Sequence, residues 1–139
     1  VVLDAVARHE VDPHRLHLEV TETALLEDVS TVRATMTRIA ESGILWYVDD
    51  FGTGYSSISH LRDLPIAGLK LDRSFTFGVA EGDRRCSELC LALVGLADGL
   101  GLDGVAEGVE TEEVARVLET HGWKHGQGWL YGRPAPAPE

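Results

Sequence analysis

Residues 44–50 read ILWYVDD, a nearly continuous apolar run that ends in two adjacent aspartates. Runs of this kind are typical of parallel strands that are buried on both faces, so we expect a strand over 44–48 that the aspartates end. An amphipathic stretch of helical period precedes it at 29–39, with Asp28 as a candidate cap. A similar stretch follows it at 58–64. This part of the chain therefore predicts strands and helices in alternation.

Four more short runs rich in apolar residues end in a side chain that could bind a metal ion or a reacting group. They lie at 16–21, 68–71, 103–107 and 126–131, and the side chains are Glu19, Lys70, Glu107 and Gln127. Helical patterns separate these runs, most clearly at 86–100 and from Thr111 onward. In a parallel (β/α) barrel, the loops after the strands all open on one face. Acids at the strand ends would converge there, so we expect a carboxylate-lined site.

The length of the chain bounds how much of such a barrel it can contain. With 139 residues it is shorter than an eight-unit barrel, which usually needs about 250. An apolar helical face at 2–7 comes first, with no strand before it. We therefore predict an α/β fold, a TIM-barrel-like (β/α) domain that is incomplete at its N-terminal side. The domain is expected over 1–133, followed by a Pro-rich tail at 134–139 that cannot continue a sheet or helix.

Charge and composition exclude several classes of function. A net charge of −11, from 23 acidic and 12 basic residues, argues against binding to polymeric nucleic acid. A small anionic ligand could bind if metal ions offset the acids. No apolar stretch approaches the length of a signal peptide or a membrane span, so we expect a cytoplasmic protein or the cytoplasmic domain of a membrane-attached one. Cys86 and Cys90, four apart in a helical pattern, are expected as small buried hydrophobic residues.

The residue types at the strand ends point to metal chemistry. Asp49 and Asp50 place two like charges side by side, and a divalent cation would stabilise that arrangement. One aspartate can also bridge two ions in a two-metal site. For an isolated pair of aspartates, the alternative is a helix cap beside a solvated acid.

Lys70 and Asp72 lie at the end of the run at 68–71. A strand-end lysine that faces several acids would be kept charged, and it could orient a water molecule or stabilise developing negative charge. The alternative is a surface lysine. Asp72 falls on the same strand face two residues later, where it could contact substrate.

Five short strings occur in order over nearly the whole chain. They are LEVTE at 18–22, DDFGTGYSS at 49–57, LKLDRSF at 69–75, AEGVET at 106–111 and QGWLYGRP at 127–134. Together they closely resemble the motifs of the EAL domain family, the metal-dependent phosphodiesterases that hydrolyse cyclic di-GMP. The resemblance implies a barrel related to the TIM fold, cleavage to the linear dinucleotide pGpG, and a site for two magnesium or manganese ions.

The resemblance also implies a set of metal ligands in this chain. Glu19 and Asp49 would bind the first ion, and Asp49 would bridge to a second ion that Asp50 and Glu107 help to hold. Glu107 is therefore expected both as a metal ligand and as a member of the catalytic group.

Three further roles follow from the same motifs. Lys70 would lie beside the attacking water, and Gln127 would reach the cluster of metal ions and water, although a glutamine before glycine is equally typical of a turn. Glu22 would anchor the loop at 51–57; without the resemblance it would be read as an acid at a helix start.

The chain also departs from the family pattern. The Glu-Ala-Leu signature that names the family and the asparagine of the next strand do not occur in it, and each would bind the first ion. We therefore expect hydrolysis by the intact protein and an inactive 139-residue piece.

Parts of the sequence are also compatible with functions other than hydrolysis. The string DFG at 50–52 matches the magnesium-binding motif of protein kinases, but no HRD-type loop precedes it and no APE follows. The remaining alternative is a non-catalytic cyclic di-GMP receptor or a dimerisation module. A homodimer could form through the loop and helix after Asp50.

Overall fold

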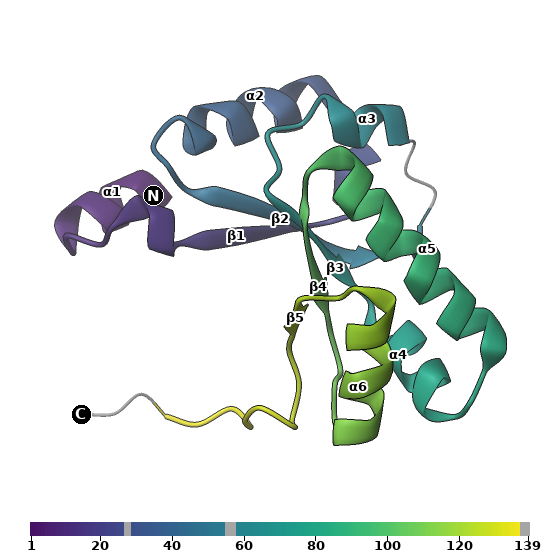
Figure 1. Ribbon diagram of the computed structural model, residues 1–139. Coiled ribbons are helices and arrows are strands. Elements are labelled where there is room, and N and C mark those ends of the chain that lie inside the picture. Colours follow the sequence, from purple (N-terminus) through teal and green to yellow (C-terminus); the bar gives the residue numbers. More distant parts are fainter. Residues whose placement is uncertain (27–28, 55–57, 137–139) are drawn as a thin grey trace. The chain divides into compact units, whose positions relative to one another are not determined.

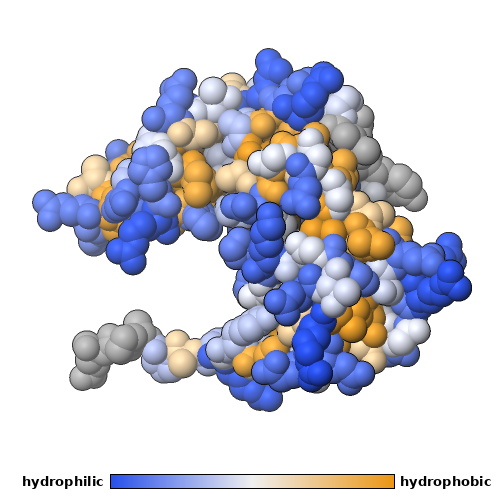
Figure 2. Space-filling model, in the orientation of Figure 1, coloured by the Kyte–Doolittle hydropathy of each residue, from blue (hydrophilic) through white to orange (hydrophobic). Residues whose placement is uncertain are grey.

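The computed structural model describes residues 1–26, 29–54 and 58–136 of the chain (Figure 1). Two compact units make up the chain, Val1–Leu69 and Lys70–Glu139, and the boundary between them falls within strand β3 (Gly68–Leu71). Hydrophilic residues, blue in Figure 2, cover much of the visible surface, and apolar residues show as smaller orange patches. Among the described residues, no helix is both long enough and apolar enough to cross a membrane.

The first unit holds two paired parallel strands, with helices before, between and after them. Its elements are α1 (Val2–Arg8), η1 (Pro13–Arg15), β1 (His17–Thr21), η2 (Ala24–Leu26), α2 (Val29–Ala40), β2 (Leu45–Phe51) and α3 (Ile58–Arg62). β1 and β2 pair in parallel. Helix α2 lies over β2 (Figure 1), and the Trp46 indole N–H donates to the Met36 carbonyl at 3.2 Å. Met36 and Val48 are buried in this unit.

The second unit has its own parallel strand pair and its own apolar core. Its elements are α4 (Arg73–Ala80), α5 (Arg84–Leu100), β4 (Asp103–Ala106), α6 (Glu112–His121) and β5 (His125–Gly126), and β4 pairs with β5. The Trp123 indole N–H donates to the Cys90 carbonyl at 3.2 Å, so the largest core side chain leaves no polar group unpaired. The buried core residues are Leu71, Cys90, Val94, Ala106, Val109, Val114, Leu118 and Trp123.

The helices of the second unit begin and end at residues that satisfy free backbone groups. Asp83 caps α5 by accepting from two backbone N–H groups of the first turn, and Gly101 ends the helix with φ 69°. Thr111 caps α6, and Gly122 ends it with φ 107°. The left-handed conformation favours glycine because glycine has no Cβ. The predicted start of a helix at Thr111 is therefore confirmed.

Strand β2 is longer than the sequence predicts. It continues through both aspartates to Phe51, whereas the apolar pattern ends the strand at Val48. Thr21 of β1 lies opposite Asp49, and the Glu22 N–H donates to the Asp49 carbonyl at 3.1 Å. Pairing with β1 therefore extends β2 beyond the apolar run, as far as Asp49.

Two elements of the second unit also differ from the expectation. Helix α4 was not expected, yet Phe75 and Val79 in it pack against the core. Strand β5 covers only His125–Gly126, whereas a strand was expected over 126–131. The chain turns there instead, because the N–H of Tyr131 donates to the Gly128 carbonyl at 3.1 Å.

The two cysteines are both free, but they differ in burial. Cys90 is 0% exposed, as expected of a small hydrophobic residue, and burial raises the pKa of its thiol to about 11. Cys86 is only half-buried, so the expectation is wrong for this residue. Asp28, the expected cap of α2, and residues 55–57 of the glycine-containing loop lie outside the described residues.

Candidate functional site

The residues predicted for the site divide between the two units. In the first unit, Glu19 pairs with Tyr47 and Thr21 pairs with Asp49 along β1 and β2. Paired residues of parallel strands project to the same side, so Glu19 and Asp49 are diagonal neighbours on one face. The rings of His17 and Tyr47 stack on this face, with centroids 4.9 Å apart. Two carboxylates on one strand face supply the oxygen donors that magnesium and manganese prefer.

Asp50 stands at an unusual point of the backbone. Its φ is 54°, in the left-handed region that residues with a Cβ seldom adopt. The Asp50 N–H donates to Asp49 Oδ1 at 3.0 Å, and the Asp50 carbonyl accepts from the Thr53 hydroxyl at 2.8 Å. Backbone strain of this kind concentrates at functional sites, which makes Asp50 a candidate for more than a structural role.

Glu22 ties the end of β1 to the loop that follows β2. It is 3% exposed, and its Oε2 accepts from the backbone N–H of Gly52 at 3.1 Å and of Gly54 at 3.0 Å. A Cβ on Gly54 would lie 2.9 Å from the carboxyl carbon of Glu22, so a larger residue there would force the Glu22 carboxylate to shift. Glu22 therefore contacts the part of the loop that the structure describes, and its role as an anchor stays a prediction.

In the second unit, Lys70 of β3 and Glu107 at the end of β4 form an ion pair. The Lys70 Nζ lies 2.5 Å from Glu107 Oε1, and the side chains are 6% and 19% exposed. The Glu107 N–H donates to the Leu71 carbonyl at 3.2 Å, which brings the ends of the two strands side by side. A buried ammonium group requires a charged partner, and Glu107 supplies one.

Gln127 is held next to Glu107 by its backbone. Its N–H donates to the Ala106 carbonyl at 2.8 Å, and its carbonyl accepts from the Val109 N–H at 3.0 Å. Gln127 and Glu107 both line a pocket of about 750 Å³, which we call the strand-end pocket. Its other walls come from Arg73, Phe77, Gly108, Glu110, Gly126, Gly128, Trp129, Tyr131, Gly132, Arg133 and Pro134. The structure therefore brings together the predicted site residues Glu107 and Gln127, with Lys70 paired to Glu107.

Asp72 has a structural task that the sequence analysis did not assign. Its Oδ1 accepts from the Ser74 N–H at 2.9 Å and from the Ser74 hydroxyl, so it caps α4. The signal was present in the sequence, because an aspartate two residues before a serine at a helix start is a common capping pattern. Contact between Asp72 and substrate stays a prediction.

Sequence reasoning also missed three residues of the strand-end pocket. Arg73, Trp129 and Arg133 all line it, and the Arg133 guanidinium carbon lies 4.5 Å from the centroid of the Trp129 ring. They lie inside the quoted strings LKLDRSF and QGWLYGRP. Their spacing in the sequence does not predict that they line one pocket, because the turn after Gln127 brings them together.

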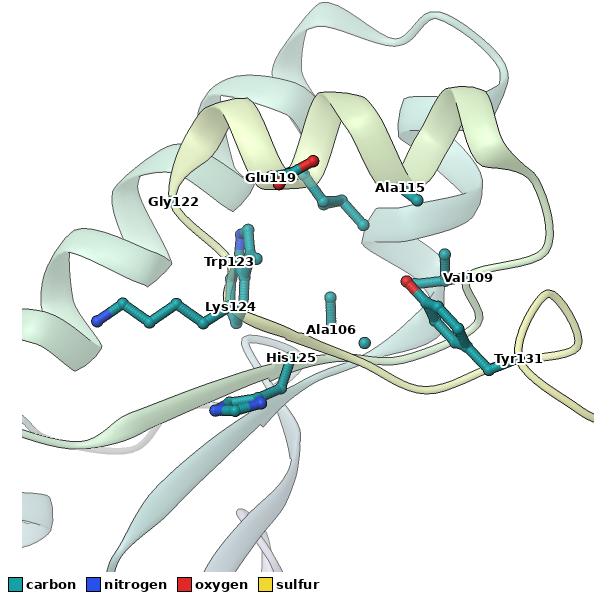
Figure 3. A pocket seen from close by; sticks show the side chains of 11 residues that line it. Ala106, Val109, Ala115, Glu119, Gly122, Trp123, Lys124, His125 and Tyr131 are labelled. Atoms are coloured by element: carbon teal, nitrogen blue, oxygen red, sulfur yellow. The ribbon is translucent and has the colours of Figure 1, made fainter.

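A second cavity of about 600 Å³ lies under α6 (Figure 3), and we call it the α6 cavity. Glu119 of α6 and Lys124, His125 and Tyr131 from the following segment contribute its polar groups. Apart from Tyr131 and Gly126, it shares no lining residue with the strand-end pocket, and it contains no predicted site residue. Its charged residues therefore provide controls for substitutions in the strand-end pocket.

Comparison with curated proteins identifies relatives of much greater length. The EAL domain family matches residues 2–134 of the chain. The cyclic di-GMP phosphodiesterase PA2567 of Pseudomonas aeruginosa is 44% identical over 126 residues, which cover 91% of this chain and 21% of that protein. The chain spans about a fifth of the length of the curated relatives it matches.

Solved structures agree with this assignment. The PaMucR phosphodiesterase, in a complex with cyclic di-GMP, has a TM-score of 0.93 at 40% identity, over 98% of this chain and 55% of that chain. BlrP1 of Klebsiella pneumoniae, in a complex with manganese and cyclic di-GMP, has a TM-score of 0.86 at 28% identity, over 96% of this chain and 34% of that one. The predicted fold class is confirmed, since these neighbours are TIM-barrel-like EAL domains of which this chain matches a part. The chain belongs to the EAL domain family.

Proposed function

We propose that the protein carrying this chain hydrolyses cyclic di-GMP to linear pGpG with the help of two magnesium or manganese ions. The observation that supports this most strongly is the buried ion pair of Lys70 and Glu107 beside Gln127 in the strand-end pocket. Relatives named as cyclic di-GMP phosphodiesterases, and a neighbour solved with manganese and cyclic di-GMP, give independent support.

The donor set fits hard divalent ions. Glu19, Asp49, Asp50 and Glu107 are all carboxylates, and they would hold the ions in the intact protein. Bound there, such ions would acidify a water molecule and offset charge on the phosphate. Asp49 lies on the strand face that Glu19 shares, which is consistent with both acids serving one ion.

Lys70 and Gln127 would act on the water and on the phosphate. The carboxylate of Glu107 at 2.5 Å favours the charged ammonium of Lys70, which can then hold a water molecule or stabilise charge that develops on the phosphate oxygens. Gln127 offers an amide that can both donate and accept a hydrogen bond at the same pocket wall. Asp72 keeps the predicted contact with substrate as part of this proposal.

The other parts of the proposal concern position and assembly. Glu22 would hold the loop after β2 in a fixed position, as its hydrogen bonds to Gly52 and Gly54 favour. Two copies of the protein could pair through this loop and α3, but residues 55–57 lie outside the described residues. We propose that the protein acts in the cytoplasm and that residues 1–133 form the domain, with 134–139 as its tail.

The test uses the full-length protein with cyclic di-GMP, and pGpG is followed by chromatography. Turnover is expected with magnesium or manganese and is expected to disappear in excess chelator, because the carboxylates alone cannot generate the nucleophile. Glu107→Gln should abolish activity, whereas Glu119→Gln in the α6 cavity should leave it unchanged. Binding of cyclic di-GMP without any turnover would favour the receptor alternative, and full turnover in chelator would contradict the proposed metal dependence.

A further inference from the structure

Exposed aromatic side chains of the described residues gather at one place. Seven large hydrophobic residues are exposed among them, and three of these are aromatic: Phe77, Trp129 and Tyr131. All three line the strand-end pocket, which also contains Glu107 and Gln127. Aromatic rings that line one pocket together offer flat surfaces against which a planar ligand can stack.

Trp129 has the largest ring of the three, and a neighbouring side chain contacts it. The residue is 55% exposed, and the Arg133 guanidinium carbon lies 4.5 Å from the ring centroid. A guanidinium at this distance makes a cation–π contact and limits the rotation of the indole. One side of the ring therefore has a partner within the protein, while more than half of the side chain stays accessible.

The turn that carries Trp129 is fixed to the same backbone as Gln127. The N–H of Leu130 donates to the Val109 carbonyl at 3.1 Å, and the N–H of Tyr131 donates to the Gly128 carbonyl at 3.1 Å. A Cβ on Gly128 would lie 2.2 Å from the Val109 carbonyl oxygen, so the two backbone segments touch. The indole is thus presented at a set distance from the catalytic candidates, with little ordering left for a ligand to impose.

The strand-end pocket is more favourable to an anionic ligand than the net charge of the chain suggests. The chain carries a net charge of −11, but Arg73 and Arg133 both line this pocket. Of the two acids there, Glu107 is already paired with Lys70. A ligand with phosphate groups and a planar base would therefore find positive charge and a stacking surface together.

We infer that Trp129 stacks against one guanine base of the cyclic dinucleotide and that Arg133 is a positioning residue that holds the indole. This inference rests on the proposed function. A base–aromatic stack is sequence-tolerant, because every base presents a π-face, so Trp129 contributes affinity and orientation. Arg133 acts through Trp129, from the opposite side of the ring.

The test compares four substitutions in the full-length protein. Loss of one stacking contact is expected to weaken binding about five- to one-hundred-fold. Trp129→Ala should raise KM by a factor in this range with kcat changed much less, while Trp129→Phe should keep most of the affinity. Arg133→Gln should raise KM, and Arg133→Lys should restore it in part, since lysine can also make a cation–π contact. Leu91→Ala, which removes a residue 53% exposed on α5 outside the pocket, is the matched control and should bind normally.

A second measurement reports the stack directly. With calcium in place of magnesium or manganese, addition of cyclic di-GMP should quench tryptophan fluorescence, and the quench should be lost in Trp129→Phe. Normal KM and quenching in both Trp129 variants, with the wild type active, would overturn the inference and leave the proposed function intact. If the wild type neither binds nor hydrolyses cyclic di-GMP, the proposed function fails and the inference with it.

Discussion

In the first unit, Glu19 and Asp49 share one face of a strand pair and Asp50 follows them, whereas in the second unit Glu107 lies against the buried Lys70. The first arrangement concentrates negative charge at the ends of two strands, and a divalent ion would relieve the repulsion. The second arrangement balances its charge by an ion pair. We therefore propose that ion binding depends mainly on the first unit and that the handling of water and phosphate depends mainly on the second.

The largest effect is expected when the 139-residue chain is expressed without the rest of the protein. We expect the 139-residue chain expressed alone to give no measurable pGpG, because it spans only 55% of the chain of its solved relative PaMucR. The full-length protein at the same concentration of manganese and cyclic di-GMP is the control. Efficient turnover by the monomeric 139-residue chain would show that these two units contain every residue that hydrolysis requires.

One substitution in each unit separates the two roles. Asp49→Asn and Lys70→Ala in the full-length protein should each lower turnover by at least about a hundredfold. The variants should differ in their response to metal: a higher manganese concentration should recover part of the Asp49→Asn activity, because the defect lies in ion affinity. It should not recover Lys70→Ala. Steady-state rates over a manganese titration measure this, and near-normal rates in both variants would make the site assignment wrong.

Stability should respond more to the second unit than to the first. Breaking a largely buried ion pair costs about 3–5 kcal/mol, because the remaining charge stays in a poorly solvated place. Glu107 is 19% exposed, so we expect Glu107→Ala to lower the free energy of unfolding by about 2–3 kcal/mol, toward or below the low end of that range. Glu19→Ala, at an exposed position of β1, should change it by less than about 0.5 kcal/mol.

Urea denaturation of the full-length protein without metal measures both variants. Glu119→Ala, an exposed acid of α6, is the control for loss of a carboxylate in the second unit. Equal destabilisation by Glu107→Ala and Glu119→Ala would show that the ion pair contributes nothing to folding.

The sequence predicted the periodic parts of this fold and the acids at its strand ends. The apolar run before Asp49, the strand with Lys70 and the helix after Thr111 were all readable, since each has a local pattern of period or cap. The approach of Lys70 and Glu107 to 2.5 Å depends on neighbouring strands far apart in sequence, so the barrel interpretation predicted their convergence but not their pairing.

Other parts of the structure could not be predicted from local patterns in the sequence. Helix α4 is short and its apolar residues Phe75 and Val79 lie among polar and small ones, so the periodic signal is weak. The cation–π contact of Trp129 and Arg133 results from the turn after Gln127. Hydrogen bonds to the backbone of Val109 hold this turn in place. Such contacts follow from tertiary packing and cannot be read from spacing alone.

The smallest effect is expected from an acid of the second unit that lies outside the proposed site. Asp83 caps α5, and the backbone N–H of Arg85 lowers the pKa of its carboxyl group. A carboxylate whose pKa is lower in the folded state stabilises the fold above its unfolded-state pKa, and this contribution is lost as pH falls through the folded-state pKa. Asp83→Asn keeps a capping oxygen but removes the charge.

We therefore expect Asp83→Asn to lower Tm slightly at neutral pH and to match the wild type once the pH lies below the lowered pKa of Asp83. Thermal unfolding followed by circular dichroism at several pH values measures this difference. Asp98→Asn on the same helix is the control for loss of an acid that caps nothing. Its unfavourable place near the C-terminal end of the helix and its exposed ion pair with Lys124 at 3.9 Å have opposite effects, so we expect a smaller change in Tm than for Asp83→Asn. A deficit in Asp83→Asn that stayed constant down to acidic pH would show that the lost cap geometry, and not the lost charge, causes it.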